Sequence, residues 1–482
     1  MVSISFRYDF TVLRRVLTLK IGRKAYFFII FLIPLIVRSI PELLSPVPIG
    51  FDTAIYLAKA KMLAASPSIL PFFARLLGLL YLLGVDLMAV MKVLPVIVFA
   101  TTILLACVYA HKRLNWSLHD VLVLAVMMSF SAAMLRMSWD LHRQSMATLL
   151  LLGYMCMDPW SGLSRGKIVA SFTLVALIGL FHELVLVVVT AINFYLAFLA
   201  FKRRSFTKAL FFSALALTSF VCYQAGVYLS YGKLASPYSV FNDALARWGS
   251  NGYSNLVSHA VGLLVATFWY VLALAPLGFF HDRYLSPWLL VMLAGYLSEI
   301  LTPFFAVRLA DRWMLYMAVP LMFYGARAVS KFAGSGGFRK LSMAVALMIV
   351  CLNGFSMLGV IEPFRLPSNL YIGFIPSTMV FSTAKPEHVV AVMEFSKIIN
   401  GVAGEDACVV THDPWFKYWA TYLTNLKVYS FSGTDPEPAI SGAMKSGCGE
   451  IYVIWFKGQV KGGELLAERG LLVLYRILKA GS

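Results

Sequence analysis

Residues 50–56 (GFDTAIY) follow the first long apolar segment and place a carboxylate, Asp52, where a membrane helix has just left the bilayer. A carboxylate fixed at a membrane surface can act as a general base. Tyr56 follows one helical turn later, and the mixed run after it carries Lys59 and Lys61. The alternative role of Asp52 is structural, because Asp is favoured at the N-terminal cap of a helix. We interpret Asp52 as the candidate catalytic residue and Tyr56 as a candidate substrate-binding residue.

Ionisable side chains recur in three later turns that we expect at the same membrane face. They combine carboxylates, imidazoles and guanidiniums, which can deprotonate a hydroxyl, hold a divalent metal and clamp a phosphate. The candidate substrate-binding residues in these turns are Asp140, His142, Arg143, Arg308, Asp311 and Arg312. An overlapping set with metal-binding side chains is Asp140, His182 and Glu183, and its cation would be Mg²⁺ or Mn²⁺.

Each of these turns also has a structural explanation. His182 and Glu183 interrupt a long apolar run with almost no loop. They are either the tip of a helical hairpin or functional, since burying either one in a membrane without a partner is costly. Residues 136–144 (RMSWDLHRQ) have the same two explanations. For residues 308–312, an internal ion pair at a helix start competes with recognition of a lipid phosphate.

The composition indicates a membrane protein. Of the 482 residues 60% are hydrophobic and 13% are charged, and the mean hydropathy is +0.79. Soluble domains carry about 25% charged residues, and the apolar segments here are long enough to cross a bilayer. The net charge of +18 is spread between these segments rather than gathered on a soluble domain. This distribution indicates cytoplasmic anchoring by the positive-inside rule and argues against a nucleic-acid partner.

The order of segments predicts a multi-pass protein of the cell membrane with a cytoplasmic N-terminus. Residues 1–24 read as a basic amphipathic helix on the inner leaflet. Residues 25–362 then hold eleven predicted spans, with a first external loop over residues 44–86. Within that loop a short apolar helix is expected at about 69–83. With this topology, basic clusters that lack acidic neighbours fall inside, and the candidate site residues fall outside.

The hydropathy drops after Pro363, and residues 363–482 alternate between predicted strands and helices. Such alternation predicts a small α/β domain with a largely parallel sheet, here on the extracytoplasmic side. Cys408 and Cys448 are the only cysteines outside apolar segments, and each lies at or just before the start of a predicted strand. We therefore predict a disulfide between them, which an oxidising exterior permits.

The layout resembles the GT-C superfamily of polytopic membrane glycosyltransferases. Residues 67–73 (PSILPFF) through 84–86 (GVD) are similar to the first-loop segment of that superfamily, and residues 136–144, 181–185 and 308–313 match it more loosely. The resemblance implies that Asp52 is the catalytic base. It also implies an inverting transfer from a polyprenyl-phosphate-linked sugar to a lipid, glycan or protein acceptor on the outer face.

Two departures narrow this expectation. Thr53 follows Asp52, so the adjacent Asp-Glu pair of protein O-mannosyltransferases is absent. The Trp-Trp-Asp-Tyr-Gly signature of oligosaccharyltransferases is absent too, and residues 413–415 (DPW) do not replace it. Transfer of a single sugar is therefore favoured. A transporter of a lipid-linked or anionic substrate and a non-catalytic membrane scaffold remain alternatives, although a transporter is expected to show repeat symmetry and polar residues near the midplane.

Overall fold

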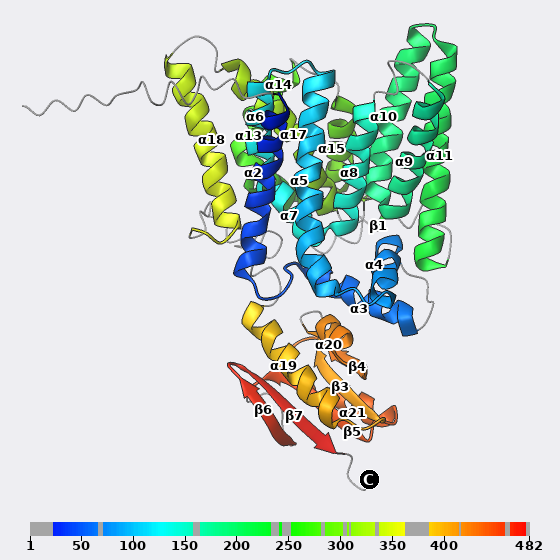
Figure 1. The fold of residues 1–482 in the computed structure, drawn as a ribbon, viewed down its shortest axis with the longest axis vertical. Helices are drawn as coiled ribbons and strands as arrows, with labels where there is room; N and C mark the ends of the chain where they lie inside the picture. The colour runs from blue at the N-terminus through cyan, green and yellow to red at the C-terminus, as the bar shows by residue number, and fades with distance from the viewer. Residues whose placement is uncertain are drawn as a thin grey trace, which may run out of the picture.

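The fold consists of a helical bundle and a small domain with a β-sheet, which lies at one end of the bundle (Figure 1). It is seen in a computed structural model of the chain. The structure describes residues 23–65, 71–157, 164–232, 241–242, 252–280, 285–301, 306–307, 310–332, 337–361, 385–413, 416–457 and 463–478. The predicted amphipathic segment 1–24 and the predicted domain boundary at 362/363 fall almost entirely outside these ranges.

Five helices among the described residues are long and apolar enough to cross a membrane. They are α2 (Arg23–Leu44), α5 (Leu87–Arg113), α10 (Glu183–Lys202), α11 (Phe206–Tyr231) and α13 (Tyr253–Leu272). The bent pair α6 (Leu118–Ser129) and α7 (Ala132–Asp140) makes a sixth if it counts as one span. The multi-pass character is confirmed.

The exact count of eleven spans is not confirmed. Several predicted spans fold as helices of 15–17 residues, whereas a helix needs about 20 residues to cross a bilayer. The other helices of the bundle and its loops in the described ranges are α3 (Phe51–Ala65), α4 (Phe72–Leu82), α8 (His142–Met157), α9 (Arg165–Phe181), α14 (Ala275–Phe279), α15 (Ser286–Leu301), α16 (Ala310–Tyr316), α17 (Ala318–Phe332) and α18 (Gly337–Met357). A two-residue strand β1 (Phe241–Asn242) pairs with β2 (Ala306–Val307).

The break between α6 and α7 bends the chain by 58° and divides one of the eleven predicted spans. Ser131 is the N-cap of α7, and its hydroxyl accepts a hydrogen bond from the backbone N–H of Met134 at 3.4 Å. The same hydroxyl lies 2.9 Å from the hydroxyl of Tyr270 on α13. The polar groups that the break exposes thus have partners, as irregular backbone inside a membrane protein requires.

The first external loop contains two helices that pack against each other, α3 and α4. The apolar helix expected at 69–83 is present as α4 and begins directly after Pro71. Leu83 and Gly84 end it, and Gly84 has a φ of +77°, which glycine adopts without strain. The carboxylate of Asp86 then accepts the backbone N–H of Met88 at 2.8 Å and caps α5.

The C-terminal domain is built on a five-stranded sheet in the order β4-β3-β5-β7-β6. The strands are β3 (Ala407–His412), β4 (Lys427–Phe431), β5 (Glu450–Phe456), β6 (Glu464–Arg469) and β7 (Leu472–Leu478). The helices α19 (Pro386–Val402), α20 (Lys417–Leu423) and α21 (Glu437–Lys445) complete it. The predicted small α/β fold is therefore confirmed.

The sheet is mixed rather than largely parallel. β3 pairs in parallel with β4 and β5, whereas β5–β7 and β7–β6 are antiparallel. β6 was not predicted, because its side chains are mostly exposed and its apolar run covers only residues 465–467. Cys408 and Cys448 form the predicted disulfide, with Cα atoms 5.9 Å apart.

Candidate active site

Gly50 sets the position of the helix that carries Asp52. Its φ of +103° is one that side chains rarely allow, and a Cβ built on it would lie 1.9 Å from the carbonyl oxygen of Trp139. The backbone before α3 therefore touches the C-terminal end of α7. This contact places Asp52, in the first turn of α3, next to the end of α7 that carries Asp140.

Asp52 is partly buried and lies among positive charges from four helices. Burial raises the pKa of its carboxyl group, and Arg312, Arg136, Lys59 and Arg143 act in the opposite direction. These cations come from α16, α7, α3 and α8, respectively. A carboxylate that titrates above its usual range and is surrounded by cations is suited to accept a proton beside an anionic substrate.

Two of the cations that act on Asp52 form ion pairs. Arg136 pairs with Asp140 within α7. Arg143, at the start of α8, lies 3.3 Å from a carboxylate oxygen of Glu183 and donates from Nε to the carbonyl of Phe181 at 2.9 Å. The turn between α9 and α10 is thereby fixed to α8.

The other two cations of the group differ from Arg136 and Arg143 in their ion pairing. Arg312 and Lys59 form no ion pair within the described part of the chain. The charge of Arg312 nevertheless acts on Asp52, Tyr56 and Glu183. Arg312 therefore belongs to the same charged group as the predicted base.

The aromatic rings of Tyr56 and His142 lie close together on one side of this group. Tyr56 is buried, its ring lies 5.0 Å from that of Phe73 and 6.0 Å from that of His142, and burial followed by the charge of Asp52 raises its pKa. Tyr56 thus stays a neutral hydroxyl. His142 is buried too, and its Nε2 lies 3.0 Å from Oγ1 of Thr53, so this residue of α8 contacts the first turn of α3.

The predicted metal ligands have other partners. Asp140 and Glu183 are each paired with an arginine. Nδ1 of His182 accepts the backbone N–H of Leu184 at 3.2 Å, so this nitrogen already has a hydrogen-bond partner. Among the described residues no group of three or more His, Cys, Asp or Glu side chains is arranged to hold a metal ion. A cation at this trio would have to displace these partners.

The other predicted binding residues are placed as follows. Arg308 lies outside the described residues. Asp311 lies in the first turn of α16, next to Arg312. Two cations of the group, Arg136 and Lys59, were not predicted as site residues from the sequence. Their electrostatic effect on Asp52 in the folded structure identifies them.

A buried ion pair supports the group from within the bundle. Arg38 on α2 is fully buried, and its guanidinium lies 3.0 Å from Glu42 and donates to the hydroxyl of Ser138 on α7 at 2.9 Å. The other carboxylate oxygen of Glu42 accepts the backbone N–H of Ile49 at 3.3 Å. The pair thus ties α2, α7 and the chain before Asp52 together.

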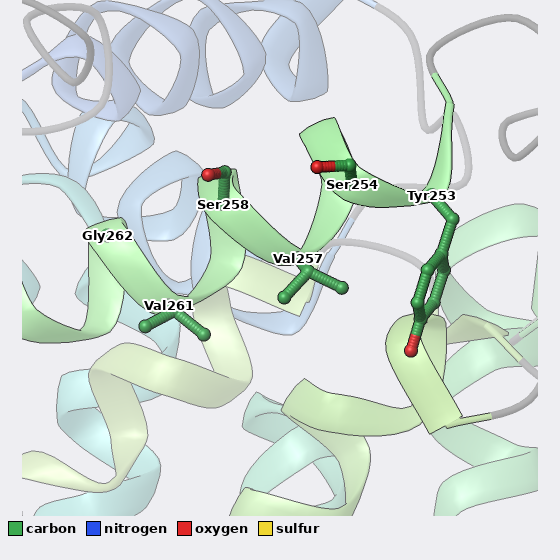
Figure 2. A pocket seen from close by; sticks show the side chains of 6 residues that line it. All are labelled: Tyr253, Ser254, Val257, Ser258, Val261 and Gly262. Atoms are coloured by element: carbon green, nitrogen blue, oxygen red, sulfur yellow. The ribbon is translucent and has the colours of Figure 1, made fainter.

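A separate, open groove runs along the first half of α13. It is lined by Tyr253, Ser254, Val257, Ser258, Val261 and Gly262, with valines on one side and serine hydroxyls on another (Figure 2). None of its lining residues belongs to the group around Asp52. The groove is therefore distinct from the candidate active site.

Solved structures with a similar fold give the chain its place among known folds. No protein-family model and no curated protein sequence matches it. ArnT from Cupriavidus metallidurans, solved with undecaprenyl phosphate bound, aligns with a TM-score of 0.59 and 10% identity over 94% of this chain and 98% of its own.

Two further structures agree with that alignment. The arabinofuranosyltransferase AftD from Mycobacteria aligns with a TM-score of 0.53 and 12% identity over 96% of this chain, which spans 40% of AftD. The oligosaccharyltransferase AglB from Archaeoglobus fulgidus, solved with an inhibitory peptide and a dolichol-phosphate, aligns with a TM-score of 0.53 and 10% identity over 90% of this chain and 70% of its own. The chain therefore has the fold of the GT-C membrane glycosyltransferases.

Proposed function

We propose that this protein is an inverting membrane glycosyltransferase that moves a single sugar from a polyprenyl-phosphate-linked donor to an acceptor hydroxyl. The observation that carries the proposal is the grouping of Asp52 with four cationic side chains at the start of α3. Two structures with the same fold were solved with undecaprenyl phosphate or a dolichol-phosphate, which supports this class of donor. The sugar and the acceptor stay open.

The reaction needs a base and positive charge. In our proposal the acceptor oxygen forms a bond to the anomeric carbon as the bond from that carbon to the phosphate oxygen breaks. Asp52 takes the acceptor proton, and the polyprenyl phosphate leaves as an anion that needs no general acid. Arg312 and Lys59 stabilise the leaving phosphate, because developing charge is best met by cations already held in place.

Arginine is the better source of that charge than a metal held by Asp140, His182 and Glu183. Each of these side chains already has another partner, and two of the partners are arginines. A site for Mg²⁺ or Mn²⁺ at this trio remains a prediction, and no step of the proposed reaction depends on it. Guanidinium groups also match phosphate oxygens geometrically, with two parallel donors.

We propose that the site lies on the extracytoplasmic face. α3, α4 and the C-terminal domain share one end of the bundle, while α5 runs from that end to the opposite one (Figure 1). The last turn of α5 holds His111, Lys112 and Arg113, and α10 likewise ends in Lys202. Basic residues at the far end favour a cytoplasmic location for it, and hence an external site.

The test is sugar transfer by the purified protein from synthetic polyprenyl-phosphate sugars. Asp52→Asn keeps the shape of the side chain and removes the base, so turnover is expected to fall about 10²–10⁴-fold. Asp86→Asn is the matched control, since Asp86 lies in the same loop but caps α5, away from the cationic group. Equal turnover by wild type and Asp52→Asn would refute the assignment. Transport of the lipid without transfer would instead favour the transporter alternative.

A further inference from the structure

The C-terminal domain contacts the membrane domain at the helix that carries Asp52. α20 packs against α3, and Figure 1 shows α20 at the edge of the C-terminal domain nearest to α3. Asp52 lies in the first turn of α3, while Lys61 lies in its last turns. One helix thus connects the candidate site at one end with the C-terminal domain at the other.

Lys61 makes this contact with hydrogen bonds. Its ammonium group donates to the carbonyl oxygens of Tyr422 at 2.8 Å and Thr424 at 2.6 Å. These carbonyls belong to the end of α20, where the backbone of a helix has no partner of its own and a positive charge is favoured. The amide of Asn400 on α19 donates to the intervening carbonyl of Leu423 at 2.9 Å. The end of α20 is therefore covered by one side chain from each domain.

The side chain of Tyr422 is influenced by charges of the first external loop. Burial, followed by the charges of Asp86 and Tyr81, raises its pKa to about 12. Tyr81 lies near the end of α4, and Asp86 caps α5, so their charges act on Tyr422 from the far end of the first external loop. α20 therefore packs against α3 and lies within electrostatic range of the junction of α4 with α5.

We propose that Lys61 is a positioning residue: its hydrogen bonds to the end of α20 hold α3, and with it Asp52, in the catalytic position. The proposal rests on the proposed function of Asp52. Without the ammonium group, the carbonyls of Tyr422 and Thr424 exchange their partner for water, and α3 gains freedom relative to the cations of α7, α8 and α16. A shift of about 1 Å in a reacting group can cost 10²-fold in rate.

The first measurement separates kcat from KM for the lipid donor. Lys61→Met keeps most of the length of the side chain and removes its donors, and we expect kcat to fall about 10–100-fold with little change in KM. Lys61→Arg restores donors to the same carbonyls and should recover most of the rate. Lys457→Met is the matched control, because Lys457 is an exposed lysine of the C-terminal domain that pairs with Glu468.

The second measurement does not depend on activity. Hydrogen exchange of the α3 amides is followed in the full-length protein in detergent or nanodiscs, and Lys61→Met should speed it, whereas Lys457→Met should not. Lys61→Gln, which keeps one amide donor, serves as the milder variant and should give an intermediate effect. Unchanged α3 exchange together with unchanged kcat in Lys61→Met would overturn the proposal. If wild type turns over no polyprenyl-phosphate sugar, the proposed function fails, while faster α3 exchange would still show that Lys61 holds this helix.

Discussion

Nε2 of His142 lies 3.0 Å from Oγ1 of Thr53, the residue directly after the proposed base. The Thr53 hydroxyl donates to the carbonyl of Ile49 at 2.7 Å, so it is left to accept a hydrogen bond from the imidazole N–H. Both side chains are buried. The Thr53 hydroxyl therefore fixes the first turn of α3 to α8. From the sequence, Thr53 was notable only because it stands where protein O-mannosyltransferases have the Glu of an Asp-Glu pair.

Replacing Thr53 with Val should test this bond. The substitution keeps the branched shape but leaves the His142 N–H buried without its partner, which costs about 1–3 kcal/mol of stability. We expect a lower thermal unfolding midpoint and reduced turnover, because the turn that holds Asp52 loses its contact with α8. Thr53→Ser keeps the hydroxyl and should stay close to wild type in both measurements. Equal stability of the Val and Ser variants would contradict the role of the bond.

Gly50 offers a second test, of the contact between the chain before α3 and α7. An alanine Cβ at this position would lie 1.9 Å from the Trp139 carbonyl oxygen, so Gly50→Ala must displace the backbone beside Asp52. The control is Gly84→Ala, which also has a positive φ but has no atom within 4 Å of the added Cβ. The control should cost about 1–2 kcal/mol from backbone strain alone.

Gly50→Ala should lose more stability than this control and most of its turnover. Thermal unfolding in detergent and the sugar-transfer assay measure the two effects. Equal losses in both variants would mean that the approach to Trp139 does not matter.

The Cys408–Cys448 disulfide should stabilise the C-terminal domain. It closes a loop of 40 residues between the ends of two paired strands, and a loop of this size corresponds to about 3–4 kcal/mol in the chain-entropy model. The double substitution Cys408→Ala, Cys448→Ala should therefore make β3 and β5 more sensitive to protease in the full-length protein. Peptide mapping without reduction checks the bond itself: free alkylation of both cysteines in native protein would show that it does not form.

The elements that the sequence predicted best are those with a strong local signal. The alternation of strand and helix patterns after Pro363 predicted β3, β4, β5 and β7, and the apolar run at about 69–83, which follows Pro67, predicted α4. The break between α6 and α7 was missed, because residues 118–140 contain neither Gly nor Pro to mark it. Likewise β6 has mostly exposed side chains, and its apolar run covers only residues 465–467. In both cases tertiary partners, and not local pattern, decide the structure.

In the candidate site, too, some features follow from the local sequence and others depend on tertiary structure. Position relative to an apolar segment was enough to select Asp52 and its arginine neighbours Arg143 and Arg312 from the sequence. The pairing of Arg143 with Glu183, by contrast, joins residues of two different helices that are 40 positions apart, and the sequence does not show which of them meet. The disulfide was predictable because parallel strands bring residues at the same edge together.

The pH dependence of turnover tests the surroundings of Asp52 most directly. Asp52 must be deprotonated to act as a base, so the rate should rise with pH through its pKa and then level off. The usual pKa of Asp is about 3.9. Burial raises the pKa of Asp52, so the acid limb should lie at a higher pH than this value. Asp52→Asn should remove this limb from the residual activity.

Arg312→Gln should shift the same limb. Arg312 is the cation with the largest effect among the four that lower the Asp52 pKa, the others being Arg136, Lys59 and Arg143. Its removal takes away a charge that favours the carboxylate, so the pKa must rise and the acid limb must move to higher pH. Lys417→Gln, in the C-terminal domain, removes a positive charge that is not among those acting on Asp52 and serves as the control. Rate profiles normalised to their plateaus separate this shift from any loss of donor binding, and an acid limb that stays in place in Arg312→Gln would place Arg312 outside the reacting group.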